Sequence, residues 1–288
     1  MPSVVIPAYN EGNGIERCLR ALLADGVADL VVVVVANACT DETAARARAV
    51  GAPITVVETE QGGKTNALNL GERALRDRGL DCYPRLFLDA DIELEPGALR
   101  ALFDASAKAG EAPHIVAARP RFEASRSTLP VRLFYSCEQF NPYHRIGAPN
   151  GSGTYVVNRA ARARWGEFPA LLADDSFVER QFAPSERATI ERATAVVRVP
   201  RTFAALRRIS ARTRLGSYEL DLVAPRRADD RGSAGTFAVV ARAMLTRPWR
   251  WPAFLVWATV KSIERLESRA VARKQGSERW QHDASSRS

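Results

Sequence analysis

Five consecutive valines at residues 31–35 restrict the fold of this 288-residue chain more than any other feature. β-Branched side chains favour strands, and a strand that is apolar at every position must be covered on both faces. Interior strands of this kind are typical of parallel sheets with helices on each side. The run ends at a polar segment, residues 37–43, where Thr40 or Asp41 is predicted to cap the next helix.

Strand and helix patterns alternate three times in the first part of the chain. Apolar runs at residues 3–6, 30–35 and 54–58 are each followed by a polar loop and a helical pattern of apolar residues. This alternation predicts an α/β fold with a Rossmann-like, doubly wound, mostly parallel sheet and a C-terminal helical extension. The chain has no Gly-x-Gly-x-x-Gly and no Gly-x-x-x-x-Gly-Lys-Ser/Thr motif, which argues against a dehydrogenase and a P-loop enzyme.

A fourth apolar run, residues 85–88, ends in the carboxylates Asp89 and Asp91. Open α/β sheets bind ligands at the carboxyl ends of their strands. If the chain stays extended, both side chains point to the same side, where they can address one divalent cation or a ribose and its diphosphate. Because Asp-x-Asp is a common pattern, an acidic turn that caps a helix near Pro96 is the alternative.

Two further groups of polar residues are candidates for the site. Asp174 and Asp175 follow an apolar run and precede a helical pattern, so one acid suits a helix N-cap and the other is available as a general base. Gly62-Gly63-Lys64 can approach a phosphate, although a glycine turn with a solvated lysine explains it equally well. Residues 207–216 carry four arginines, which indicate either a solvated basic face or a diphosphate clamp.

The C-terminal part of the chain is basic and rich in tryptophan. Residues 201–288 contain 18 Lys/Arg and 8 Asp/Glu, a net charge of +10 in a chain of net charge +8. The apolar stretch at residues 251–263 is shorter than the roughly 20 residues that span a bilayer. We therefore expect either an in-plane helix on an anionic membrane or a helix docked on the protein or on a second subunit. No recognition module for nucleic acid accompanies the charge, so nucleic acid is not an expected partner.

Several motifs, in order, resemble an inverting glycosyltransferase of family 2 with the GT-A fold. The resemblance covers about residues 1–225 and begins with Val4-Val5-Ile6-Pro7-Ala8-Tyr9-Asn10-Glu11. Asn37 stands where the family usually carries an aspartate that touches the base, and Gly63-Lys64-Thr65-Asn66-Ala67-Leu68-Asn69 is similar to an element beside the nucleotide. The resemblance implies that the following residues bind the nucleotide: Pro7, Ala8, Tyr9, Glu11, Asn37, Lys64, Asp89, Arg212 and Arg214.

The same resemblance implies roles in metal binding and catalysis. Asp91, with Asp89, would hold the Mn²⁺ or Mg²⁺ that bridges the diphosphate, while Asp89 contacts the ribose region. Asp175 would be the catalytic base, with Asp174 as the alternative. Arg212 and Arg214 would cover the leaving diphosphate from a flexible lid, although the tryptophan usual in that region is missing. That absence, and the lack of transmembrane helices, argue against a processive polysaccharide synthase.

The resemblance also implies an organisation and a setting. We expect a catalytic domain at residues 1–225 (nucleotide half 1–110, acceptor half 111–225), a helical segment at 234–274 and a disordered tail at 275–288. The implied substrates are a nucleotide-sugar donor and a saccharide or lipid-linked acceptor in cell-surface polysaccharide or glycolipid assembly. With no secretory signal expected, the implied location is cytoplasmic, with peripheral contact at the inner face of the cell membrane. A nucleotidyltransferase and a non-catalytic binding protein of the same fold are the alternatives.

Overall fold

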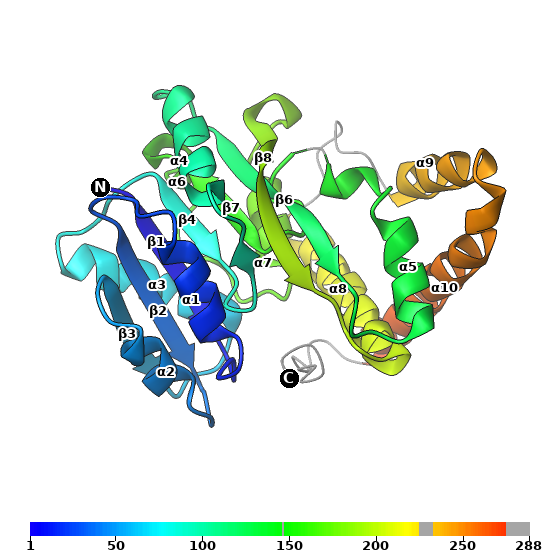
Figure 1. Ribbon diagram of the computed structural model, residues 1–288, viewed down its shortest axis with the longest axis horizontal. Coiled ribbons are helices and arrows are strands. Elements are labelled where there is room, and N and C mark those ends of the chain that lie inside the picture. Colours follow the sequence, from blue (N-terminus) through cyan, green and yellow to red (C-terminus); the bar gives the residue numbers. More distant parts are fainter. Residues whose placement is uncertain (146, 225–232, 275–288) are drawn as a thin grey trace. The chain divides into compact units, whose positions relative to one another are not determined.

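The computed structural model describes residues 1–145, 147–224 and 233–274 (Figure 1). The expected tail, residues 275–288, lies outside this range. The chain divides into two compact units. Unit 1 comprises Met1–Arg121, Ile146–Ala170 and Gln181–Val197, and unit 2 comprises Phe122–Arg145, Leu171–Arg180 and the residues from Arg198 onward.

An eight-stranded sheet, in the order β3-β2-β1-β4-β7-β6-β8-β5, forms the centre of unit 1. Its first four strands are parallel: β1 (Ser3–Ala8), β2 (Val31–Asn37), β3 (Ile54–Thr59) and β4 (Arg85–Leu88). The valines of β2 are covered on both faces, as their sequence requires. The predicted α/β fold class is confirmed, and these four strands are the predicted parallel core.

The remaining strands extend the sheet with antiparallel pairs, β4 with β7, β6 with β7, and β5 with β8. They are β5 (Glu93–Leu94), β6 (Ile115–Glu123), β7 (Thr154–Val157) and β8 (Arg187–Arg198). A glycine-containing segment, residues 150–153, leads into β7. Strand β5 was not predicted, because two residues are too few to show a period.

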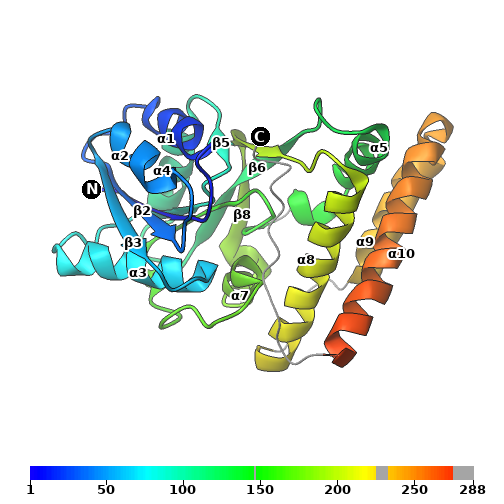
Figure 2. The ribbon, with the colours of Figure 1, turned by 90° about the horizontal axis from the view of Figure 1, so that it is seen from below.

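Helices cover both faces of the parallel strands (Figure 2). One face carries α1 (Ile15–Leu23), α2 (Thr43–Ala49) and α4 (Ala98–Lys108), and the other carries α3 (Lys64–Asp77). Two short helical turns, α6 (Arg159–Arg162) and η2 (Pro184–Glu186), complete unit 1. The amino end of α4 is capped by the distant Asp25 carboxylate, which accepts from the backbone N–H groups of Gly97 and Leu99.

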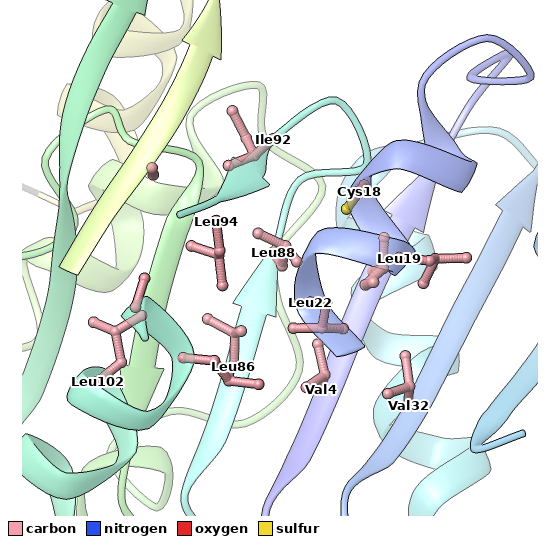
Figure 3. Packing of buried hydrophobic residues seen from close by; sticks show 14 of the residues in the cluster. Val4, Cys18, Leu19, Leu22, Val32, Leu86, Leu88, Ile92, Leu94 and Leu102 are labelled. Carbon is pink, nitrogen blue, oxygen red and sulfur yellow. The ribbon is translucent and has the colours of Figure 1, made fainter. Parts of the chain in front are cut away.

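Side-chain alternation along the strands separates the two faces. Leu86 and Leu88 of β4 join Leu19 and Leu22 of α1 in one buried cluster (Figure 3). Phe87, between them, faces the other side and stacks on the ring of Tyr155 at a centroid distance of 4.9 Å. By the same alternation, the residue after Leu88 begins on the face that α3 covers.

Helices dominate unit 2. They are α5 (Leu129–Glu138), η1 (Pro142–His144), α7 (Asp174–Glu179), α8 (Phe203–Val223), α9 (Ser233–Leu245), η3 (Pro248–Arg250) and α10 (Trp251–Lys274). Helix α10 buries Ala253, Trp257 and Val260 in a core shared with α5 and α8. One face of α10 is therefore docked on the protein. No helix in the described part of the chain is long and apolar enough to cross a membrane.

Helix α3 lies unusually close to the parallel strands at Gly71. A Cβ atom added there would be 2.5 Å from Cγ1 of Val5 and 3.3 Å from Cγ2 of Val35. Real Cβ atoms do not approach other carbon atoms this closely, so the glycine sets the distance between α3 and the sheet. This spacing fixes the height of Lys64, the first residue of α3, above the strand ends.

We expect Gly71→Ala to lower the free energy of unfolding by about 1–3 kcal/mol, because overpacking a filled core costs this amount. The gain in helix propensity, about 1 kcal/mol, opposes the change and does not cancel it. Urea denaturation measures the difference. Gly166→Ala is the control, because an added Cβ meets nothing within 4 Å there. A Gly71→Ala protein as stable as the wild type would contradict the close approach.

Candidate active site

The Asp-x-Asp segment forms a tight turn at the end of β4. The Asp89 N–H donates to the Gly153 carbonyl at 2.9 Å, and the Ile92 N–H donates to the Asp89 carbonyl at 3.1 Å. The chain is therefore not extended through Asp91, and strand alternation does not place the two carboxylates on one side. The condition for that expectation, an extended chain, is not met, and the alternative of an acidic turn describes the backbone here.

The two carboxylates have different neighbours. Asp89 Oδ1 lies 2.8 Å from Nζ of Lys64, the first residue of α3. Burial raises the pKa of the Cys18 thiol in α1, and among nearby charges that of Asp91 raises it most. Asp89 thus faces the amino end of α3, and the charges of both aspartates are close enough to Cys18 to raise the pKa of its thiol.

Gly153 allows the turn to lie against β7. Its φ is +66°, and an added Cβ would be 2.6 Å from Cγ1 of Ile92 and 3.1 Å from Oδ2 of Asp89. Only glycine accepts this backbone conformation and this contact without strain. Gly153 thus lets β7 begin directly against the Asp-x-Asp turn.

Negative charge is concentrated at this end of the sheet. Besides Asp91, the carboxylates of Glu93, Asp89 and Glu11 raise the pKa of Cys18. Within the described residues, no group of three or more His, Cys, Asp or Glu side chains is arranged to hold a metal ion. Mg²⁺-type sites often use only one or two carboxylates and complete their coordination with substrate phosphates. The oxygen donors of Asp89 and Asp91, in an acidic setting, fit such an ion.

The loops after β1 and β2 hold each other in place. The Glu11 N–H donates to Oγ1 of Thr43 at 2.7 Å, and the Gly12 N–H donates to Oδ2 of Asp41 at 2.9 Å. The predicted helix cap at Thr40 or Asp41 is shifted, since α2 begins at Thr43 after Glu42. The Asp41 carboxylate instead joins the two loops. Burial would raise its pKa, but hydrogen bonds from Thr43 and Gly12 lower it below its usual value.

The other predicted nucleotide contacts of unit 1 differ in exposure. Pro7 and Ala8 are buried within β1, and Tyr9 is partly exposed in the loop that follows. Asn37, the last residue of β2, is 1% exposed, and its Oδ1 has no hydrogen-bond partner among the residues that the structure describes. A buried acceptor without a donor is costly and rare, so Asn37 Oδ1 is a candidate to accept from a ligand.

Asn69 has a structural role that sequence reasoning did not assign. Its Nδ2 donates to the Phe168 carbonyl at 3.0 Å, and its Oδ1 accepts from the Phe168 N–H at 2.8 Å. This reciprocal pair ties α3 to a loop almost a hundred residues away in the chain. The one sequence feature that could have pointed to this role is the position of Asn69 at the end of the motif that begins with Gly63 and Lys64.

The second acidic pair lies in unit 2, in the first turn of α7. The helix begins at Asp174, and its N-cap is Ala173, so neither acid is the predicted capping residue. Asp174 is 4% exposed, whereas Asp175 is partly exposed and its Oδ1 accepts from the Ser176 N–H at 2.7 Å. Carboxylates in the first turn of a helix interact favourably with its dipole, which eases their like-charge repulsion.

An aromatic residue from the segment between α5 and β7 accompanies this pair. The Tyr143 hydroxyl is hydrogen-bonded to the Ser176 side chain. Burial raises the pKa of Tyr143 well above its usual value, and the carboxylates of Asp175 and Glu179 raise it further. No role beside the acids was predicted for Tyr143 from the sequence.

The two candidate arginines lie within helix α8 and not on a loop. Two residues on a helix are about 200° apart around its axis, so Arg212 and Arg214 face different directions. Arg212 is one turn before Gly216, whose added Cβ would be 3.2 Å from Cβ of Ala173. It therefore shares the face that packs on the start of α7. The Arg214 guanidinium lies over the Tyr218 ring instead, at 5.1 Å.

A buried carboxylate fixes the turn that carries Tyr143. Glu138 is 6% exposed, and it accepts from Trp257 Nε1 at 2.5 Å and from Asn141 Nδ2 at 2.8 Å. His144 Nε2 lies 3.2 Å from Glu138 Oε1, and Lys261 Nζ lies 3.8 Å from the same atom. Burial would raise the pKa of Glu138, but Lys261, His144 and Asn141 outweigh it and hold that pKa far below its usual value.

Glu138→Gln should lower the free energy of unfolding at neutral pH by about 2 kcal/mol, because hydrogen bonds to charged groups contribute this much. A depressed carboxyl pKa contributes stability above the unfolded pKa, about 4.3, and this contribution is lost as the pH falls toward the folded value. The difference from wild type should therefore shrink in urea titrations below about pH 4. Glu219→Gln on α8 serves as the control. A difference that persists unchanged in acid would contradict the assignment.

Comparison with known proteins identifies a matching family and several solved structures that resemble this chain. A family model described as "Glycosyl transferase family 2" matches residues 3–161. A comparison with curated protein sequences finds no match.

Among solved structures, the mannosyltransferase PcManGT from Pyrobaculum calidifontis, in complex with GDP-Man and Mn²⁺, is 25% identical to this chain, with a TM-score of 0.57. The match covers 94% of this chain and 79% of that one. A mycobacterial protein shares the fold at 21% identity and a TM-score of 0.53, over 79% of this chain and 76% of its own. S. aureus TarS in complex with UDP is 15% identical, with a TM-score of 0.49, over 95% and 92% of the two chains.

Proposed function

Since this chain belongs to glycosyl transferase family 2, we propose that it moves a sugar from a nucleotide-diphosphate sugar to an acceptor hydroxyl and inverts the anomeric carbon. The observation that carries the proposal is the ion pair of Lys64 and Asp89, with an N–O distance of 2.8 Å. It joins the amino end of α3 to the Asp-x-Asp turn at the carboxyl edge of the parallel strands. A helix amino terminus, an ammonium group and nearby carboxylates are the parts of a metal-assisted diphosphate site.

Unit 1 is proposed to hold the donor. The diphosphate would lie at the amino end of α3, where the helix dipole and Lys64 both favour negative charge. The buried Oδ1 of Asn37 would accept a hydrogen bond from an N–H group of the nucleobase. Tyr9 and Glu11 flank the same edge of the sheet in a loop that Asp41 stabilises. The solved complex of PcManGT with GDP-Man supports a donor of this class.

Asp91 and Asp89 would hold a divalent cation, Mn²⁺ or Mg²⁺, together with the donor phosphates. When bound, such an ion stabilises charge that develops on the leaving diphosphate. The acidic surroundings of Cys18 support this assignment, and so does the Mn²⁺ in the solved complex of PcManGT. Lys64 is the positive group of unit 1 proposed for the same charge, and Arg212 of unit 2 remains a predicted diphosphate contact.

Unit 2 is proposed to supply the base. The acceptor O–H gives its proton to a carboxylate while its oxygen bonds to the anomeric carbon. The bond from that carbon to the diphosphate oxygen breaks, and its electron pair leaves with the nucleoside diphosphate. A general base must be within reach of the acceptor, which favours the partly exposed Asp175 over Asp174, at 4% exposure. Saccharides and lipid-linked saccharides are the acceptors we propose, and contact with an anionic membrane accompanies the second class.

Asp175→Asn should lower kcat by about 10²–10⁴-fold, the usual contribution of a general base, and leave donor affinity close to that of the wild type. The donor is first identified by a thermal-shift screen of UDP-, GDP- and dTDP-sugars with and without Mn²⁺. Transfer is then measured under single-turnover conditions, and donor affinity by calorimetry. Glu179→Gln, on the same helix, is the matched control. Normal turnover in Asp175→Asn would move the base to another residue.

Asp91→Ala should weaken Mn²⁺-dependent donor binding by at least about a hundredfold, since even outer-shell partners of a metal contribute 10–100-fold. Calorimetric titration of the donor at fixed Mn²⁺ measures this loss. Asp104→Ala, at an exposed position of α4, controls for the removal of one negative charge. Unchanged Mn²⁺-dependent affinity in Asp91→Ala would refute the metal assignment and leave that of Asp175 intact.

A further inference from the structure

The turn between α9 and α10 exposes large apolar side chains that the core of unit 2 does not cover. The exposed fractions are 73% for Leu245, 72% for Trp249, 53% for Trp251 and 66% for Leu255. We call these four residues the turn surface. Trp251 Nε1 donates to the Met244 carbonyl at 3.2 Å, so the polar atom of this indole is used within the turn while its ring remains exposed.

The turn surface is confined to one end of α10. Trp251 and Leu255 are one helical turn apart, on the side away from the buried Trp257. The next exposed positions along that side, Thr259 and Ser262, are polar. Leu266, farther along the same side, is 67% exposed. The apolar exposure of α10 is thus interrupted by polar positions and is densest at the turn.

Basic residues predominate in the sequence around the turn surface, and one of them, Lys261, is paired with Glu138 and Glu264. Residues 233–263 contain four basic residues and no Asp or Glu. The guanidinium groups of Arg247 and Arg250 lie 5.2 and 5.3 Å from the centroid of the Phe140 ring. Arg250 also donates to the Ser136 carbonyl at 3.0 Å. These contacts hold the turn against α5. Because the partners are an aromatic ring and a carbonyl group, they do not neutralise the charge of either arginine.

We propose that the turn surface inserts into the interface of an anionic lipid bilayer. Tryptophan is enriched at the level of the lipid head groups, and nearby arginines are attracted to anionic lipids. A second copy of the chain is a poorer partner, because a symmetric contact would bring the same positive segments together without compensating acids. The inference rests on the proposed function in one respect only, that membrane contact brings a lipid-linked acceptor within reach.

The test is cosedimentation of the full chain with phosphatidylcholine vesicles, with and without phosphatidylglycerol. The wild type should sediment with the anionic vesicles, and Trp249→Ser/Leu255→Ser should weaken this binding by about a hundredfold, roughly tenfold for each apolar side chain. Leu222→Ser/Val223→Ser is the matched control, because these residues are 86% and 62% exposed at the far end of α8 (Figure 2). The control should bind like the wild type.

Three outcomes would overturn the proposal: a wild type that stays in the supernatant with anionic vesicles, a turn-surface variant that binds as well as the control, or a wild-type dimer in analytical ultracentrifugation that the turn-surface substitutions dissociate. The last would assign the surface to a second copy. Donor affinity, measured without vesicles, should be equal in all variants. Failure of membrane binding is thereby distinguished from failure of the proposed glycosyl transfer, which is read from donor binding and turnover alone.

Discussion

Burial of the parallel strands on both faces is the constraint on which the rest of unit 1 depends. Strands β1, β2 and β4 leave room for polar groups only at their ends. At the amino end, Arg85 is 1% exposed and is paired with Glu72 at 2.5 Å and Asp81 at 2.6 Å, since a buried charge without partners would be prohibitively costly. At the carboxyl end, Asn37 and Asp89 provide the polar groups that a ligand can use. The positions of the candidate site and of the buried ion pairs thus both follow from the burial of the parallel strands on both faces.

Much of this arrangement could be predicted from the sequence, because it depends on local patterns. The valine run and the alternation with helices specified the parallel strands. The sequence did not decide between an extended chain and a turn through Asp91, since both have the same residues. The cap of α4 could not be predicted, because the Asp25 side chain that provides it comes from 72 residues away. Local patterns contain no information about such distant partners.

In unit 2, too, local patterns predict some elements, whereas contacts between distant residues could not be predicted. Helix α10 was expected, whereas α8 lies where a flexible lid was predicted. The docking of α10 depends on the indole of Trp257 reaching a carboxylate 119 residues earlier in the chain. The four arginines of α8 suggested one clamp, yet the helical period separates Arg212 from Arg214. A cluster of like residues in sequence is a cluster in space only if the backbone conformation puts their side chains on one face. That conformation was uncertain at the sequence level, and it decides which arginine remains a candidate.

Backbone conformation also distinguishes the residues within each of the two acidic pairs, Asp89/Asp91 and Asp174/Asp175, which are proposed to carry out the reaction. In each pair the two aspartates are nearly equivalent in sequence, and the backbone makes them different. Asp89 directly follows the strand and is paired with Lys64, whereas Asp91 lies within the turn, so the two proposed metal ligands have different surroundings. The first turn of α7 buries Asp174 and leaves Asp175 partly exposed, which separates a structural acid from a candidate base. The family match ends at residue 161, before this second pair. The case for Asp175 therefore depends on its exposure and on its neighbours Tyr143 and Ser176, which belong to this chain.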